Sequence, residues 1–403
     1  MILQDQIAEI ADSQIELFLN KPAGIKREML ASVPDMDNFA TIITGIRRCG
    51  KSTLLLQLLK EKQDNAFYFN WEDIRLSAFD TDDFKRLYND IIRRNVRILF
   101  FDEIQLVKGW EVFVHQLLRE GFRVFVTGSN ASLLSREMGT HLTGRHFSIE
   151  LFPFSFAEFC SFKNIQQDIN ALDMYVKTGG IPDYVKTEQG FVLQQLTDDI
   201  LMRDIVVRYG IRDVDALRQL TVFLLSNVGN LTSANKLTGL FGTKSAATIL
   251  EYFSYLTNSY LVEFVPQFDY SLKAQSRNPK KIYAIDTGLV TEVSNTFSEN
   301  TGHVFENLIY LHLRREKNEI FYFKKDGECD FVVKEREKIT RAIQVCYELN
   351  DENFDREAKG ILAAMNFFGL NEGFVVTKNQ DDVFQKDGKM IKVVSAVNFL
   401  KNN

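Results

Sequence analysis

The chain of 403 residues lacks any long run of apolar residues and contains only four cysteines. No apolar run approaches the roughly 18 residues that a membrane span needs, so we expect no contact with a membrane. The cysteines, Cys49, Cys160, Cys329 and Cys346, are scattered, without the paired spacing of metal sites. Unpaired cysteines of this kind are typical of reduced thiols, and we therefore expect a cytoplasmic location.

The sequence also lacks an excess of positive charge, internal repeats and low-complexity tracts. Its net charge of −6 argues against a uniformly basic nucleic-acid coat, although it leaves a local basic face open. The first twenty residues have no basic segment and carry Asp5, Glu9 and Asp12, which predicts an amphipathic helix rather than a signal peptide. The length and the apolar content of 45% are those of a globular protein of two or three domains.

The stretch GIRRCGKST, residues 45–53, follows an apolar run at residues 39–43. Its glycine spacing fits a phosphate-binding loop, because glycines let several backbone N–H groups point at one anion. Lys51 is expected to reach the β- and γ-phosphates and Ser52 to ligate Mg²⁺, at the start of a helix over residues 52–61. The predicted loop consists of Gly45, Ile46, Arg47, Arg48, Cys49, Gly50, Lys51, Ser52 and Thr53. Arginines such as Arg47 and Arg48 more often face outward than touch phosphate.

A second apolar run, residues 98–101, ends in Asp102 and Glu103. Two acids directly after a buried strand indicate the edge of a parallel sheet where ligands bind. Asp102 is expected to hold Mg²⁺, directly or through water, and Glu103 to orient and polarise the attacking water. An ordinary helix cap is the alternative.

A third apolar run, residues 122–127, precedes Gly128, Ser129 and Asn130. Asn130 or Ser129 is the candidate contact to the γ-phosphate or the attacking water, and a helix cap is again the alternative. Further strand patterns lie at residues 66–70 and 146–151, and helical patterns at residues 82–93 and 110–120. Strands alternating with helices predict an α/β fold with a parallel sheet covered on both faces. The extra strand between the two nucleotide motifs, and the Glu beside Asp102, resemble the ATPase branch that includes the AAA+ proteins.

Seven motifs then occur in order: KREML (26–30), GIRRCGKSTLLLQLL, FYFNWEDIRL (67–76), FFDEIQLVKGWE (100–111), TGSNASLL, LTGRHFSIELFPFSFAEF (142–159) and GGIPDYV (179–185). Over nearly the whole chain they resemble bacterial and archaeal AAA-type ATPases that carry a DUF4143 C-terminal region. The resemblance implies ATP hydrolysis with Mg²⁺ and an adenine slot near residues 26–28. It also implies an arginine finger at Arg145, acting in cis or from a neighbouring subunit, with a structural salt bridge as the alternative.

The middle of the chain is rich in helical patterns. Residues 154–213 resemble the lid that closes over nucleotide in AAA+ proteins, with a hinge at Gly179-Gly180-Ile181-Pro182. Helical patterns at 214–227, 233–239 and 245–257, and strands at 260–265 and 281–285, indicate a winged helix-turn-helix. The expected DNA contacts on or beside its recognition helix are Lys244, Ser245 and Thr248, and those on its wing are Lys273, Arg277, Lys280 and Lys281. The expected partner is double-stranded DNA, with a protein partner as the alternative.

The last part of the chain resembles the PD-(D/E)XK nuclease fold in its order of helices and strands. That chemistry needs acids to hold Mg²⁺ and a lysine to position or activate water. Glu306 and Asp330 match two of the acids, but the next motif reads Gln344-Val345-Cys346, with cysteine in the lysine position. Glu348 is an alternative acid. We expect a retained fold whose cleavage activity is lost or crippled.

These patterns divide the chain into five regions. They are an N-terminal helical segment (1–36), a P-loop AAA+ ATPase core (37–153), a helical lid (154–213), a winged helix (214–285) and a nuclease-like α/β domain (286–403). The leading hypothesis is an Mg²⁺-dependent ATPase that drives or gates a DNA-associated C-terminal half. The alternatives are a nucleotide-controlled switch that binds a protein partner, and an active ATP-regulated nuclease. Homo-oligomer formation is left open.

Overall fold

The computed structural model describes residues 2–34, 36–62, 65–129, 145–294 and 301–401. The chain forms two compact units, Met1–Phe152 and Pro153–Asn403. Their boundary lies next to the border between ATPase core and lid that the sequence suggests. No helix in the described part of the chain is both long and apolar enough to cross a membrane.

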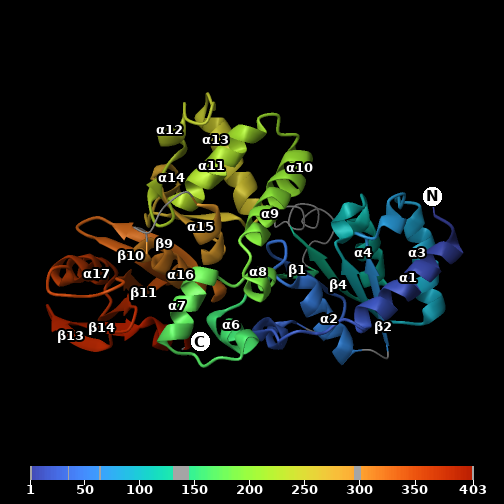
Figure 1. The fold of residues 1–403 in the computed structure, drawn as a ribbon, viewed down its shortest axis with the longest axis horizontal. Coiled ribbons are helices and arrows are strands. Elements are labelled where there is room, and N and C mark those ends of the chain that lie inside the picture. The colour runs from blue at the N-terminus through green and yellow to red at the C-terminus, as the bar shows by residue number, and fades with distance from the viewer. Residues whose placement is uncertain (1, 35, 63–64, 130–144, 295–300, 402–403) are drawn as a thin grey trace. The chain divides into compact units, whose positions relative to one another are not determined.

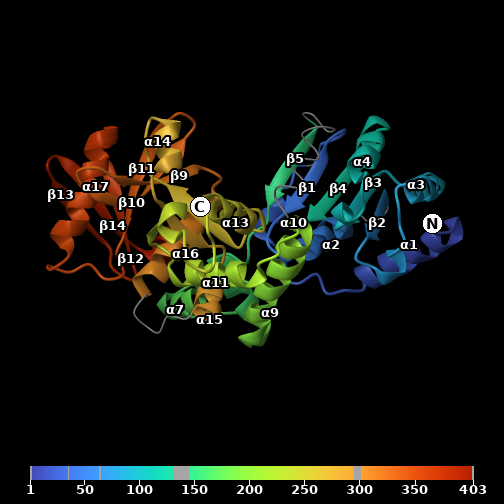
Figure 2. The same cartoon turned by 90° about the horizontal axis from the view of Figure 1, so that it is seen from above.

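The first unit is built on a five-stranded parallel sheet in the order β2-β3-β4-β1-β5. Its strands are β1 (Ala40–Thr44), β2 (Ala66–Asn70), β3 (Ile98–Asp102), β4 (Arg123–Gly128) and β5 (His146–Glu150). They lie in this row in Figure 2. The prediction of a parallel α/β sheet is confirmed. Strand β4 lies between β1, which precedes the phosphate loop, and β3, which ends in the acidic pair. The carboxyl ends of these three parallel strands are therefore neighbours.

Helices precede and connect the strands of this sheet (Figure 1). They are α1 (Gln4–Leu19), α2 (Lys51–Glu61), α3 (Asp83–Arg94) and α4 (Trp110–Arg119), with the single 3₁₀ turns η1 (Glu28–Ser32), η3 (Ile74–Leu76) and η4 (Ile104–Leu106). The helices predicted at residues 52–61, 82–93 and 110–120 are thus confirmed to within one residue.

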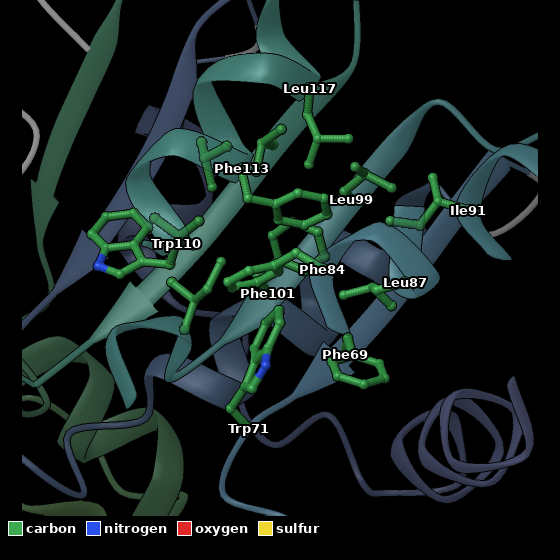
Figure 3. Close-up of a cluster of buried hydrophobic side chains, with 14 of the residues drawn as sticks. Phe69, Trp71, Phe84, Leu87, Ile91, Leu99, Phe101, Trp110, Phe113 and Leu117 are labelled. Atoms are coloured by element: carbon green, nitrogen blue, oxygen red, sulfur yellow. The ribbon is translucent and has the colours of Figure 1, made fainter. Parts of the chain in front are cut away.

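An aromatic core fixes strand β3 against the helices on one face of the sheet (Figure 3). Phe84 of α3 stacks on Phe113 of α4 with ring centroids 4.6 Å apart, and Trp71 meets Phe101 edge-on at 5.3 Å. Because successive side chains of a strand point to opposite faces, Phe101 enters this core while Phe100 and Asp102 point to the other face. The core therefore holds β3 in a fixed register and determines where its terminal aspartate lies.

The second unit begins with a series of helices. They are α6 (Phe156–Lys163), α7 (Ile169–Thr178), α8 (Pro182–Thr187), α9 (Phe191–Asp199), the π-helical turn η5 (Ile200–Val206) and α10 (Val207–Tyr209). The Gly179-Gly180 pair lies between α7 and α8. The N–H of Gly180 donates to the buried carboxylate of Asp286 at 2.6 Å, and a Cβ added to Gly179 would lie 2.1 Å from the same carboxylate. The glycines predicted as a hinge thus have a packing reason, since they let the backbone approach Asp286.

Three helices and a small antiparallel sheet follow. They are α11 (Val214–Ser226), α12 (Ala234–Leu237), α13 (Ala246–Asn258) and the strands β6 (Leu231–Thr232), β7 (Val262–Pro266) and β8 (Lys280–Ala284), in the order β6-β8-β7. The helices and the β7–β8 pair match the predicted elements. The segment between the two strands, where the sequence predicts a wing with Lys273 and Arg277, contains a helix, α14 (Leu272–Arg277).

The remaining residues form a six-stranded mixed sheet with helices α15 (Thr287–Val293), α16 (Thr301–Arg315), α17 (Phe354–Phe368) and α18 (Ala396–Lys401). The strands are β9 (Glu319–Lys324), β10 (Glu328–Glu335), β11 (Lys338–Val345), β12 (Glu372–Thr377), β13 (Asp382–Lys386) and β14 (Lys389–Ser395), in the order β13-β14-β12-β11-β10-β9. The predicted order of helix, hairpin, strand, helix and strand is present. Strands β13 and β14 and helix α18 extend it.

Candidate functional sites

The loop between β1 and α2 has the backbone that its glycines allow. Gly45 and Gly50 adopt φ angles of 141° and 99°, which other residues rarely adopt. A Cβ at Gly45 would lie 2.2 Å from the carbonyl oxygen of Leu151, and one at Gly50 would lie 2.8 Å from Arg27. Gly50 directly precedes α2 and offers no side chain to cap it. The first N–H groups of α2 and the helix dipole are therefore directed at the space inside the loop.

Lys51 is the first residue of α2 and is buried. Its ammonium group donates to the carbonyl oxygens of Gly45 and Ile46, both at 3.0 Å, so the loop curls around the lysine. Ser52 is exposed beside it and Thr53 is half-buried. Hydrogen bonds to these two carbonyls hold the ammonium within the loop. When an anion binds there, its oxygens can take the place of the two carbonyl oxygens.

The other loop residues have structural partners. Cys49 is buried, which raises the pKa of its thiol even though Lys51 and Arg27 lower it. The guanidinium of Arg27 donates to the carbonyls of Cys49 and Phe152, each at 2.8 Å. Arg47 lies 3.6 Å from Glu72, and Arg48 adopts a φ of 61°. Arg27, which we predicted near the adenine slot, thus supports the phosphate loop from behind.

The acidic pair is located at the carboxyl end of β3, as predicted. Asp102 is buried, and its two carboxylate oxygens accept hydrogen bonds from the hydroxyls of Thr127 and Tyr68, the latter at 3.0 Å. The same Thr127 hydroxyl accepts the backbone N–H of Glu103 at 3.1 Å. Glu103 adopts a φ of 53°, and its carboxylate accepts from Gln105. Burial raises the pKa of Glu103, while the nearby Lys51 lowers it.

Thr127 and Tyr68 are two further residues of the site, which no sequence pattern indicates. We had proposed Ser129 or Asn130 after β4; Ser129 is buried, and Asn130 lies outside the described residues. Their place in the site follows from the register of the sheet, in which Phe101 pairs with Val126 and Asn70 pairs with Asp102. That register puts Thr127 next to Asp102 and directs Tyr68 to the same face of the sheet.

Arg145 is exposed and directly precedes β5. Its carbonyl accepts the N–H of Ala40, the first residue of β1, so Arg145 lies at the amino end of the sheet. The phosphate loop follows the opposite end of β1, about 15 Å away at the usual rise of a strand. A finger role in cis does not fit this placement, whereas a role in trans remains a prediction.

The predicted DNA-contacting residues differ in their exposure. Lys244, Lys273 and Arg277 are exposed. Ser245 caps α13 by accepting the N–H of Thr248 at 3.2 Å, and the two hydroxyls lie 3.0 Å apart. Lys280 is half-buried, while Lys281 is buried with 3% exposure. The prediction that Lys281 faces DNA is wrong, because β8 points its side chain inward.

Lys281 instead joins the nuclease-like acids. Its ammonium lies 2.7 Å from Asp330 and 3.0 Å from Glu306, and Tyr283 donates to the same oxygen of Glu306. Burial raises the pKa of Asp330 to about 6, although Lys281 opposes this. For Glu306 the effect of burial is outweighed, chiefly by Lys281, and the pKa is lowered. The two predicted acids therefore do come together, but around an ammonium group.

Gln344 and Cys346 also lie near this cluster. The amide of Gln344 donates to Glu357 at 2.7 Å and accepts the N–H of Asp330 at 3.3 Å. Cys346 is buried, which raises the pKa of its thiol to about 11, and its Sγ donates to the carbonyl of Glu348. A thiol is neutral when protonated and negative when ionised. Cys346 therefore supplies no cation at the position where the nuclease motif has lysine. The side chain of Glu348 is exposed.

Comparison with known proteins supports the first unit as a nucleotide domain. A model described as an AAA domain matches residues 37–160. Residues 169–300 match a domain of unknown function, DUF8612, so the DUF4143 region suggested by the sequence is not confirmed.

Two solved structures show distant likeness. The RuvB Holliday junction branch migration motor of Thermotoga maritima has a TM-score of 0.32 at 18% identity, covering 64% of this chain and 89% of that one. AMPPCP-bound DnaA from Aquifex aeolicus has a TM-score of 0.27 at 15% identity, covering 62% and 88%. At these TM-scores neither likeness carries an argument.

Two curated proteins are similar over most of their length. Uncharacterized protein MJ1544 of Methanocaldococcus jannaschii is 35% identical over 379 residues, covering 87% of this chain and 84% of that protein. An uncharacterized protein of Haemophilus influenzae is 30% identical over 353 residues, covering 82% and 88%. The chain therefore belongs to the protein family that includes these two relatives, and it carries an AAA domain over residues 37–160.

Proposed function

We propose that the first unit binds ATP with Mg²⁺ and hydrolyses it, and that this cycle drives or gates a DNA-associated second unit. The observation that carries the proposal is the arrangement of Lys51, held inside its loop by the carbonyls of Gly45 and Ile46 and close enough to Glu103 that its charge opposes the rise in pKa that burial causes. A lysine that contacts the phosphates and a residue that orients the attacking water are two of the parts that recur in P-loop ATPases.

The donor atoms suit a magnesium ion. Ser52 offers an exposed hydroxyl at the start of α2, and Asp102 offers a carboxylate at the end of β3, both hard oxygen donors. Both Asp102 oxygens already accept a hydrogen bond, which favours contact through water. With an ion held there, the site would gain positive charge to offset the negative charge of the phosphates.

The chain's own groups supply the rest. Lys51 exchanges the carbonyls of Gly45 and Ile46 for phosphate oxygens, gaining charge-assisted bonds. Glu103 accepts a proton from the attacking water or orients it, and burial makes its carboxylate a better base by raising its pKa. The hydroxyl of Thr127 keeps Asp102 and the Glu103 backbone in a fixed relation.

The DNA-associated role is supported by the element order of α11, α12, α13, β7 and β8 and by the exposed Lys244, Lys273 and Arg277. We expect contact through phosphates, which makes binding independent of sequence and sensitive to salt. The test is ATPase turnover with and without double-stranded and single-stranded DNA, alongside DNA affinity over a salt series.

In that test, Lys273→Ala and Arg277→Ala should each lower the salt slope by about 1. Lys177→Ala and Lys186→Ala, exposed lysines of α7 and α8, are matched controls and should leave it unchanged. DNA affinity equal in all four variants, with turnover indifferent to DNA, would contradict a DNA-associated role.

A nucleotide-controlled switch that binds a protein partner is the second candidate. It is favoured by the inward side chain of Lys281 and by the use of Ser245 and Thr248 in a helix cap, which leave fewer groups for DNA. Turnover unaffected by DNA but changed by a co-purifying protein would support it.

A further inference from the structure

Around Lys281 the second unit gathers three carboxylates. Its ammonium lies 2.7 Å from Asp330, 3.0 Å from Glu306 and 3.8 Å from Glu328. The three acids come from α16 and β10, and the lysine from β8. A register shift in β10 between Cys329 and Val332 leaves Asp330 unpaired with β9. Such a bulge changes the direction of a side chain relative to the regular strand.

Two polar cavities adjoin this cluster. One of about 520 Å³ is lined by residues that include Thr232, Lys281, Glu306 and Asp330, and one of about 390 Å³ includes Glu306, Asp330, Gln344 and Glu357. Thr232 is buried, and its hydroxyl has no hydrogen-bond partner among the described residues. Water and small ions can therefore reach both sides of the acidic group.

A nuclease of the fold suggested by the sequence would hold a divalent metal between the acids at positions 306 and 330. These residues do not fit one here. The ammonium of Lys281 already lies between them. Tyr283 donates to the same oxygen of Glu306 as the ammonium, and the N–H of Val345 donates to the other oxygen of Asp330. Glu357 is paired with Gln344 and Arg356. Among the described residues no group of three or more His, Cys, Asp or Glu side chains is arranged to hold a metal.

We propose that the ammonium of Lys281 takes the place of the divalent cation between Glu306 and Asp330. The site then contains its own cation and binds no metal. One positive charge on a buried lysine neutralises the carboxylates only in part, but the ammonium occupies the place between Glu306 and Asp330 and repels a second cation there. The ion pairs of Lys281 with Glu306 and Asp330 also link β8 to α16 and to β10. The site is then a fixed internal ion-pair cluster rather than a phosphodiesterase centre.

An opposing interpretation makes Lys281 the replacement for the lysine missing at Cys346. In that case the wild-type protein would bind metal beside the ammonium and cut DNA. The two interpretations differ in what wild-type protein does with Mn²⁺, which is therefore the first measurement.

The test compares Mn²⁺ binding to the wild-type chain, Lys281→Met and Lys280→Met by electron paramagnetic resonance and by thermal shift. Lys280 is the adjacent residue of β8 with a half-buried side chain, and serves as the matched control. Saturable binding and a rise of several degrees in melting temperature are expected only for Lys281→Met, because the carboxylates it leaves unpaired can then take the metal. A double variant, Lys281→Met with Asp330→Asn, should lose this binding.

Two results would overturn the proposal. One is saturable Mn²⁺ binding by the wild-type chain that Asp330→Asn abolishes, a measurement that needs no change at Lys281. The other is a folded Lys281→Met chain whose melting temperature does not rise with Mn²⁺. A Lys281→Met chain that stays unfolded even with Mn²⁺, although the double variant folds, would also overturn it.

Discussion

The hydroxyl of Thr127 donates to the carboxylate of Asp102, and so ties the end of β4 to the end of β3. The same oxygen accepts the N–H of Glu103. A single uncharged group thus fixes both acids of the proposed site, one through its side chain and the other through its backbone.

Replacing Thr127 by valine keeps the shape of the side chain and removes both hydrogen bonds. We expect turnover to fall about 10- to 100-fold with ATP affinity largely retained, since one buried hydrogen bond to a charged group is worth about 1.5–3 kcal/mol. Steady-state kinetics and nucleotide titration check this. Thr41→Val, a buried threonine of β1 whose hydroxyl bonds to the Pro34 carbonyl, is the matched control and should leave turnover unchanged. Equal effects of the two variants would point to general destabilisation.

Lys51→Ala should abolish hydrolysis and weaken ATP binding by about 10- to 100-fold, because a charge-assisted contact to phosphate is lost. Lys60→Ala, near the other end of α2, should change neither quantity. Fluorescent-nucleotide titration and phosphate release measure the two effects. Turnover near the wild-type value in Lys51→Ala would refute the assignment of the loop.

Glu103→Gln should retain ATP binding and lower turnover by about 10²–10⁴, because the amide keeps the size of the side chain but accepts no proton. Single-turnover hydrolysis separates the chemical step from binding. Glu111→Gln, in the first turn of α4, is the control. A folded Glu103→Gln chain that fails to bind ATP would make Glu103 a structural residue instead.

Arg145→Ala should slow hydrolysis with binding intact only if chains assemble, because its place at the amino end of β5 is remote from its own phosphate loop. Mixing Arg145→Ala with Lys51→Ala should then restore part of the activity, as each chain supplies what the other lacks. Sedimentation of the ATP-bound protein reports the assembly. Unchanged turnover in Arg145→Ala alone would remove the finger role.

His312 predicts an acid-sensitive second unit. Burial lowers its pKa to about 4, whereas the unfolded chain has the ordinary value of 6.5. Between these values the unfolded state binds a proton that the native state does not, so stability falls as the pH drops from 6.5 towards 4, by at most about 3 kcal/mol. His312→Gln should lose this part of the pH dependence. Urea unfolding of both proteins from pH 8 to pH 4.5 measures it, and parallel curves would show that His312 stays out of the transition.

The sequence predicted what is local. The strands, the glycines of the loop and the position of Asp102 after β3 follow from short-range patterns and are present in the structure. Tyr68 and Thr127 were missed because their roles depend on the register between strands, which no short window contains. Lys281 was misplaced for a similar reason. A lysine in a basic segment favours solvent, and only the distant acids on α16 and β10 make its burial favourable.

The support of the phosphate loop by Arg27 has a mechanical consequence. Its guanidinium grips the carbonyl of Cys49 within the loop and that of Phe152, the last residue of the first unit. The carbonyl of Leu151 closes over Gly45 at the other end of the loop. The loop and the chain's exit from the unit are thus one stiff piece. Phe152 is tied to the loop through the side chain of Arg27, and the neighbouring Leu151 is tied to β1 because its N–H donates to the carbonyl of Thr44. A pull on the backbone after Phe152 therefore reaches the loop by both routes.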